Sequence, residues 1–268
     1  MKWTKRLSIL SFFLLLFLFT ACEDTLKYVN FEQFENTKAE KLADAVRNED
    51  IEEIERIVKT DKVPVDFQEP EIGNTVLMVA VVAQKRNSIK KLLELGANPN
   101  LTEKKWSQSA FQLGCERFLD GKCDIELIDL LIKYGADVNF PQTYNHSNGT
   151  YFQTPLMLSV HWNVWFPDDR LFYHLIKKGA DINTIGVDES SCIVVTVTSR
   201  DRLDLLKYLL FVKKAKIPAL GNIKFKGTEN EQRITFIDYL KSKKYDKWSE
   251  NYKLKKEILQ FLKQKGYK

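Results

Sequence analysis

The chain has 268 residues, 44% of them apolar, and its 41 lysine and arginine residues outnumber its 36 aspartate and glutamate residues. A chain of this length and apolar content can bury a core without metal ions or disulfide bonds, so a small metal- or disulfide-dependent scaffold is not expected. The charge is unevenly distributed, because residues 213–268 hold 16 basic and 6 acidic residues. Such an excess can orient a protein towards an anionic partner or a membrane surface. A solvated, lysine-rich helical face is the alternative interpretation.

The N-terminal sequence MKWTKRLSILSFFLLLFLFTACED has the zones of an export signal. Basic residues come first, residues 7–21 are uncharged and mostly apolar, and Glu23 and Asp24 follow Cys22. An apolar run of 15 residues is shorter than the roughly 20 residues of a membrane-spanning helix, and it is typical of a signal peptide. Residues 1–21 are therefore expected to be a signal peptide.

Residues 19–22, with the sequence FTAC, resemble the bacterial lipobox, although Phe19 stands where leucine is usual. The resemblance implies cleavage before Cys22, lipid attachment at Cys22, and a tether over residues 22–37. A plain signal peptide or a short anchor with an incidental cysteine is the alternative. Glu23 and Asp24 also resemble the acidic surface-export signals of Bacteroidetes lipoproteins. Nucleic acid is not expected as a partner of an exported chain.

Three segments repeat one motif: LLELGANPN at 92–100, LLIKYGADVN at 130–139 and LIKKGADIN at 175–183. Each follows a matching segment: GNTVLMVAV at 73–81, WSQSAFQLGC at 106–115 and FQTPLMLSV at 152–160. These sequences resemble ankyrin repeats, whose unit is about 33 residues long. The resemblance covers residues 38–268. It implies an all-α ankyrin-repeat solenoid of about six helix-turn-helix units, with hairpin-like connections and atypical terminal repeats.

Each central unit carries three kinds of residue at fixed places. A hydroxyl residue is expected to cap the first helix by accepting a hydrogen bond from a backbone N–H, at Thr75, Ser109, Thr154 and Ser191. Five residues later, a small residue is expected to let neighbouring helices approach closely, at Ala80, Gly114, Ser159 and Thr196. A glycine is expected to end the second helix in the left-handed conformation, at Gly96, Gly135 and Gly179.

The outer units are less regular. Residues 42–59 match the repeat without a clear opening turn or glycine stop, and they are expected to cap the N-terminal end. In the fifth unit, residues 202–210 lead to Lys213 where a glycine is expected. The last unit is expected over residues 235–266, with Gly266 in the usual place. Terminal repeats are often atypical because one face meets water.

Aromatic residues gather in irregular parts of the array, which include the long connection at 139–154 and extra residues between the paired helices of the third and fourth units. Aromatic side chains outside the core are common anchors of protein interfaces. The predicted partner-binding residues are Trp106, Tyr144, Tyr151, Trp162, Trp165 and Phe166. Local packing over the inserted loops is the alternative, above all for Trp162 and Trp165.

The sequence contains no recognisable catalytic or metal-binding motif. His146, His161 and His174 do not stand at metal-ligand spacing with one another or with a cysteine or carboxylate. Catalysis, a metal ion and a cofactor are therefore not expected. Cys115 is expected to be a buried apolar side chain. A bridge between Cys115 and Cys123 is possible in an oxidising compartment.

These expectations combine into a monomeric, envelope-anchored protein that binds another protein through the concave face and the fingers of the solenoid. The lipid would hold it at the outer membrane, on the periplasmic side or at the cell surface. Three narrower functions remain open. One is an immunity protein that neutralises a secreted toxic effector, and another is an envelope scaffold that organises or protects a resident enzyme or complex. The third is a surface-exposed factor that engages a host protein or a glycan.

Overall fold

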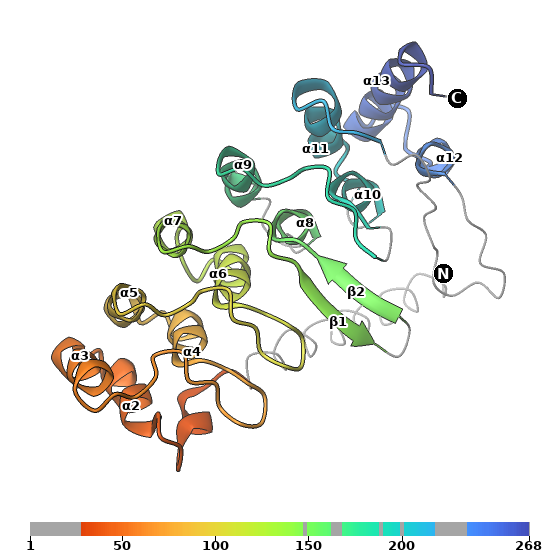
Figure 1. Ribbon diagram of the computed structural model, residues 1–268. Coiled ribbons are helices and arrows are strands. Elements are labelled where there is room, and N and C mark those ends of the chain that lie inside the picture. Colours follow the sequence, from red (N-terminus) through yellow and green to blue (C-terminus); the bar gives the residue numbers. More distant parts are fainter. Residues whose placement is uncertain are drawn as a thin grey trace, which may run out of the picture. The chain divides into compact units, whose positions relative to one another are not determined.

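The computed structural model describes residues 28–146, 149–161, 168–187, 190–198, 201–217 and 235–267. These residues are mostly helical, and they form six helix pairs and one two-stranded sheet (Figure 1). The chain divides into two compact units: Met1–Arg117 with Lys122–Ala136, and Phe118–Gly121 with Asp137–Lys268. We describe each unit separately. The helical repeat architecture expected from the sequence is confirmed at this level.

Unit 1 begins with a short 3-10 helix, η1 (Phe31–Phe34), followed by three helix pairs. The pairs are α2 (Glu40–Asn48) with α3 (Ile51–Lys59), α4 (Val76–Val82) with α5 (Arg86–Glu94), and α6 (Ala110–Leu119) with α7 (Ile125–Lys133). First helices pack on first helices, α2 on α4, and second helices on second helices, α3 on α5 and α5 on α7. Helix α4 is buried from Val76 to Val81, so this apolar segment forms the centre of the unit.

Unit 2 begins with an antiparallel hairpin, in which β1 (Gln142–His146) pairs with β2 (Gly149–Gln153). Three helix pairs follow: α8 (Pro155–His161) with α9 (Arg170–Lys177), α10 (Cys192–Thr198) with α11 (Leu203–Lys207), and α12 (Phe236–Ser242) with α13 (Glu250–Gln264). A π-helical segment, η2 (Tyr208–Val212), continues α11. Helix α10 packs on both α8 and α11.

The predicted helix caps are confirmed. Each hydroxyl oxygen accepts a hydrogen bond from the backbone N–H three residues later, which satisfies one of the helix's unpaired donors. The donors are Met78 at 3.2 Å from Thr75, Gln112 at 3.3 Å from Ser109, Met157 at 3.2 Å from Thr154 and Val194 at 3.3 Å from Ser191.

The predicted small positions are also confirmed. Ala80, Ser159 and Thr196 are buried. At Gly114, an added Cβ would lie 3.0 Å from Cδ1 of Leu131 on α7, closer than nearly all real Cβ contacts. A larger residue at Gly114 would therefore force the Leu131 side chain of α7 to move by a few tenths of an ångström.

The glycines that end the second helices have left-handed backbone angles, with φ of 92° at Gly96, 94° at Gly135, 96° at Gly179 and 87° at Gly266. In the first repeat, whose stop was not evident from the sequence, Lys62 takes the left-handed conformation with φ of 59°. In the fifth repeat, the expectation that the stop falls at Lys213 was wrong by one residue. Lys213 has φ of −87°, and Lys214 takes the left-handed conformation with φ of 57°.

The π-helical segment η2 explains this shift. In the second repeat, which lies in unit 1, the N–H of Ala97 donates to the carbonyl of Leu92, five residues earlier, at 3.0 Å. In the fifth repeat, which lies in unit 2, the N–H of Ala215 donates to the carbonyl of Leu209, six residues earlier, at 2.9 Å. The wider helical turn accommodates one extra residue, so the chain leaves the helix through Lys214.

The folded part of the chain includes residues assigned to the tether by the sequence. Val29, Phe31 and Phe34 are buried, and Arg47 on α2 forms an ion pair of 3.0 Å with Glu32. Because these residues pack on the first helix pair, the ordered structure already includes Tyr28, whereas the expected tether extended to residue 37. Residues 22–27 lie outside the described residues.

No disulfide bond joins the described cysteines, so Cys115 and Cys123 are not bridged. Cys115 and Cys192 are buried, and burial raises the pKa of Cys115 well above its ordinary value and that of Cys192 to about 12. A neutral, buried thiol is inert, which agrees with the expectation that Cys115 is an apolar core side chain.

Candidate partner-binding surface

Polar side chains connect successive repeats where the second helices end. In unit 1, Asp66 Oδ1 accepts from the backbone N–H of Asn98 at 2.8 Å, and Asn100 Nδ2 donates to the carbonyl of Gly135 at 2.7 Å. The same kind of hydrogen bond between neighbouring repeats occurs twice in unit 2. The N–H of Asp181 donates to Asn139 Oδ1 at 2.7 Å, and the N–H of Lys216 donates to Asn183 Oδ1 at 2.7 Å. These contacts fix the positions from which the connecting turns start.

The connecting turns of unit 1 form two fingers, finger 1 over residues 66–75 and finger 2 over residues 100–109. Finger 1 closes with a β-bridge between Gln68 and Thr75, and finger 2 closes with one between Thr102 and Ser109. Each encloses a buried carboxylate, Glu69 in finger 1 and Glu103 in finger 2.

Both carboxylates accept hydrogen bonds from the backbone of their own finger. Glu69 accepts from the N–H groups of Glu71 at 2.8 Å, Ile72 at 2.7 Å, Asn74 at 3.1 Å and Gly73. Glu103 accepts from Trp106 at 2.8 Å and Gln108 at 2.9 Å. Burial raises the pKa of Glu103, although these backbone hydrogen bonds act in the opposite direction. Convergent N–H groups of a turn bind an anion, so each finger is closed around its own carboxylate.

Glu69 and Glu103 are not among the residues predicted from the sequence. A signal was present, because each stands six residues before its helix-capping residue, Thr75 or Ser109. In unit 2 a third finger is closed by the bridge between Ile185 and Ser191. Gly186 follows the bridge residue there, as Glu69 and Glu103 do in unit 1, and its N–H donates to the carbonyl of Ser190 at 2.8 Å.

Fingers 1 and 2 are joined to each other. Gln68 Nε2 donates to the carbonyls of Gly73 at 2.8 Å and Thr102 at 2.9 Å. Lys104 donates from its backbone N–H to Ile72 and from Nζ to Pro70, both at 2.7 Å. These hydrogen bonds therefore hold the two fingers together side by side.

Trp106, a predicted partner-binding residue, lies on finger 2 and is half-buried. Its ring centroid is 5.4 Å from that of Tyr28. Lys105 Nζ lies 3.7 Å from the centre of the Tyr28 ring and 4.2 Å from that of Trp106. Asn74 Nδ2 fixes this arrangement by donating to the carbonyl of Tyr28 at 2.6 Å. One side of Trp106 therefore contacts the N-terminal segment of the same chain.

The other described partner-binding residues lie on the hairpin of unit 2. Tyr144 on β1 stands opposite Tyr151 on β2 in the ladder, and the Tyr151 side chain is half-buried. The hairpin is thus a finger with five-residue strands, whereas fingers 1 and 2 each close with a single bridge. Trp162, Trp165, Phe166 and the lipid-attachment candidate Cys22 lie outside the described residues.

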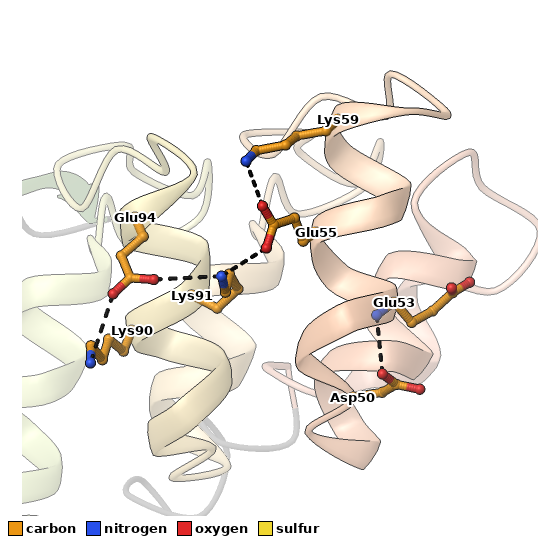
Figure 2. A network of polar contacts seen from close by, with 7 residues as sticks. All are labelled: Asp50, Glu53, Glu55, Lys59, Lys90, Lys91 and Glu94. Carbon is orange, nitrogen blue, oxygen red and sulfur yellow. Dashed lines mark hydrogen bonds and ion pairs between the residues drawn. The ribbon is translucent and has the colours of Figure 1, made fainter.

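The second helices of unit 1 present a charged face instead (Figure 2). Glu55 on α3 bonds to Lys59 at 2.5 Å and to Lys91 on α5 at 3.0 Å. Lys91 also approaches Glu94 at 3.7 Å. The hydrogen bonds from Lys59 and Lys91 lower the pKa of Glu55 to about 2. This face carries paired charges, whereas the predicted aromatic contact Trp106 lies on a finger.

Metal and membrane-spanning sites were also sought. The described part of the chain contains no cluster of three histidine, cysteine or acidic side chains that could hold a metal ion. None of its helices has both the length and the apolar composition needed to cross a membrane.

Comparisons with known proteins place one repeat firmly. The ankyrin repeat family matches residues 72–104, which extend from finger 1 through α4 and α5 into finger 2. A mouse (Mus musculus) protein, ankyrin repeat and MYND domain-containing protein 1, is 25% identical over 174 residues, or 59% of this chain. The chain covers only 18% of that relative's length. Ankyrin repeats generally mediate protein–protein interaction and are not generally enzymes. Residues 72–104 are therefore an ankyrin repeat within a mostly helical chain.

Proposed function

We propose that this chain is a protein-binding module of the bacterial cell envelope, attached to the outer membrane by lipid at Cys22. Its partner contacts the fingers and the concave face rather than the paired-charge face of the second helices. The chain contributes no catalytic group and no cofactor, and it acts as a monomer.

The β1–β2 hairpin carries this proposal. The hairpin of unit 2 has five-residue strands, so its ladder is longer than the single bridges that close fingers 1 and 2. It brings Tyr144 and Tyr151 to opposite positions of one ladder. Tyrosine offers a large contact area with few rotatable bonds, which suits it to anchoring a partner.

The binding proposal is tested by replacing Trp106, Tyr144 and Tyr151 with alanine in the full chain. The triple variant should lose the envelope protein captured by the wild-type chain, while its helical circular dichroism stays the same. Tyr267→Ala is the matched control, because Tyr267 is a 41% exposed tyrosine that follows α13 and belongs to no finger. Undiminished capture by the triple variant would refute the assignment.

Tyr28→Ala separates the two roles of Trp106. This variant removes the ring beside Trp106 but leaves Trp106 itself in place. If Trp106 contacts a partner, Tyr28→Ala should bind at least as well as the wild-type chain. Loss of capture in both Tyr28→Ala and Trp106→Ala would instead mean that Trp106 only secures the N-terminal segment.

The location is tested independently through Cys22→Ala. Without the attachment point the chain should move from the membrane fraction to the soluble fraction. Recovery of Cys22→Ala from the membrane in the same amount as the wild-type chain would contradict lipid attachment at this residue.

A further inference from the structure

Trp248 is the most exposed large apolar side chain among the described residues. It lies in unit 2 between α12 and α13, and 91% of its surface is accessible to solvent, compared with 74% for Val187, the next in order. An aromatic side chain has a large apolar area, and leaving it in water forfeits the free energy that its burial would provide. A single exposed apolar residue is ordinary, so the surroundings of Trp248 decide its meaning.

The residues that carry Trp248 form a fixed loop, which we call the Trp248 loop (residues 243–249). At its base, Asp201 binds Lys243 Nζ at 2.8 Å and accepts from the hydroxyl of Tyr245 at 3.0 Å. At its tip, the N–H of Trp248 donates to Asp246 at 2.8 Å. Ser249 closes the loop by capping α13, since it accepts from the N–H of Tyr252 at 3.2 Å. Trp248 is therefore held outward by an ordered loop.

The charge around Trp248 is positive. Residues 241–256 contain seven lysines, no arginine and two acidic residues. Lys244 and Lys247, in the loop beside Trp248, are both exposed. Lys255, another of these lysines, holds the loop. Its Nζ donates to the carbonyls of Lys241 at 2.7 Å and Lys243 at 2.5 Å. Lys244 and Lys247 are therefore exposed ammonium groups in the same short loop as the exposed indole ring.

We propose that the Trp248 loop contacts an anionic lipid surface. An indole ring prefers the boundary between headgroups and acyl chains, and each nearby lysine adds attraction to anionic headgroups. The composition favours lipid over an acidic protein, because protein interfaces are enriched in arginine and depleted in lysine. The inference rests on the membrane attachment proposed above, and it adds a second, electrostatic contact. A lipid chain combined with a basic patch gives firmer membrane attachment than either alone.

The test uses the purified full chain with vesicles whose phospholipids carry bromine on their acyl chains. Bromine quenches indole emission on contact, so quenching reports that a tryptophan has entered the lipid. Vesicles of phosphatidylglycerol with phosphatidylcholine should quench the emission more than vesicles of phosphatidylcholine alone. Trp248→Phe should remove this difference. Trp106→Phe, the matched control, should preserve it.

The lysines are tested with Lys244→Gln and Lys247→Gln. Each should shift the equilibrium away from the quenched state by about 5-fold, the effect of one basic residue near an anionic surface. Salt at about 1 M, where the Debye length falls to about 3 Å, should abolish the difference between the two vesicle types.

Three results would overturn the inference. Equal quenching in both vesicle types, or quenching that survives Trp248→Phe, would show that the loop does not enter anionic lipid. Emission from Trp248 that responds to envelope proteins but not to lipid would identify an acidic protein as its partner. Fractionation of Cys22→Ala reports on the anchor alone, so failure of the anchor and failure of the loop contact are distinguishable.

Discussion

Units 1 and 2 use different residues at equivalent places in the repeat. The small position is a glycine at Gly114 in unit 1 and a threonine at Thr196 in unit 2. The left-handed stop is a glycine in some repeats, such as Gly96 in unit 1, and a lysine in others, such as Lys214 in unit 2. The backbone is nevertheless left-handed at both stops, with φ of 92° at Gly96 and 57° at Lys214. The repeat therefore preserves backbone geometry and packing distance, and the residue type follows from the local space.

The largest expected effect comes from Gly114. Valine at this position would be forced against Leu131, and overpacking of this kind destabilises a domain by about 2–3 kcal/mol. Urea unfolding followed by circular dichroism measures the change. Thr196→Val is the matched control at the same register in unit 2, where the space for a branched side chain already exists. It should cost only about 1 kcal/mol, for the lost hydrogen bond from the Thr196 hydroxyl to the carbonyl of Ile193 at 2.6 Å. Equal losses in the two variants would mean that the small position is not packed differently in the two units.

The second effect concerns the fingers. The Glu103→Gln substitution keeps the size of the side chain but presents an amide N–H₂ to backbone donors. At least one buried N–H group then loses its acceptor, so Glu103→Gln should destabilise unit 1 by about 2 kcal/mol. Amide exchange at Trp106 and Gln108, which donate to Glu103, should accelerate. Exchange at Gly186, in the finger of unit 2, should not change. Unaltered exchange at Trp106 would contradict the role assigned to Glu103.

The third effect tests the helix stops by exchanging them. Lys214→Gly should stabilise unit 2 by about 1 kcal/mol, because glycine adopts the left-handed conformation without the steric cost paid by lysine. Gly96→Lys should destabilise unit 1 by about the same amount. Thermal unfolding of both variants provides the measurement. A Lys214→Gly variant less stable than the wild-type chain would show that the lysine side chain, whose Nζ donates to the carbonyl of Phe211 at 2.5 Å, outweighs the backbone strain.

The sequence was sufficient for the repeating parts of the fold. Caps, small positions and glycine stops have local chemical causes, so Thr75, Gly114 and Gly135 could be assigned from spacing alone. The stop at Lys214 could not be placed, because nothing in the residues of η2 signals that its turn holds one extra residue.

The candidate site was harder to predict. Glu103 is charged, and its burial depends on backbone N–H groups that only the folded finger brings together. Contact between Trp106 and Tyr28 joins residues far apart in the chain, which periodicity does not report. Tyr144 and Tyr151 were selected as aromatic residues of one long connection, and the hairpin register shows why they stand opposite each other.

The smallest effect lies on the charged outer face, where no backbone geometry is at stake. Glu55, whose pKa is lowered to about 2 by the hydrogen bonds from Lys59 and Lys91, should return towards its ordinary value of 4.5 in the Lys59→Gln, Lys91→Gln double variant. A carboxyl whose pKa is lower in the folded state stabilises the fold above the unfolded value, and this contribution disappears as the pH falls from about 4.5 towards 2. Carboxyl-detected NMR titration measures the pKa directly. Lys90→Gln is the control, because Lys90 approaches Glu94 and not Glu55. A Glu55 pKa that remained near 2 in the double variant would show that the two lysines do not cause the shift. Exposed ion pairs contribute little to stability, so the unfolding midpoint at neutral pH should change far less here than at Gly114, Glu103 or Gly96.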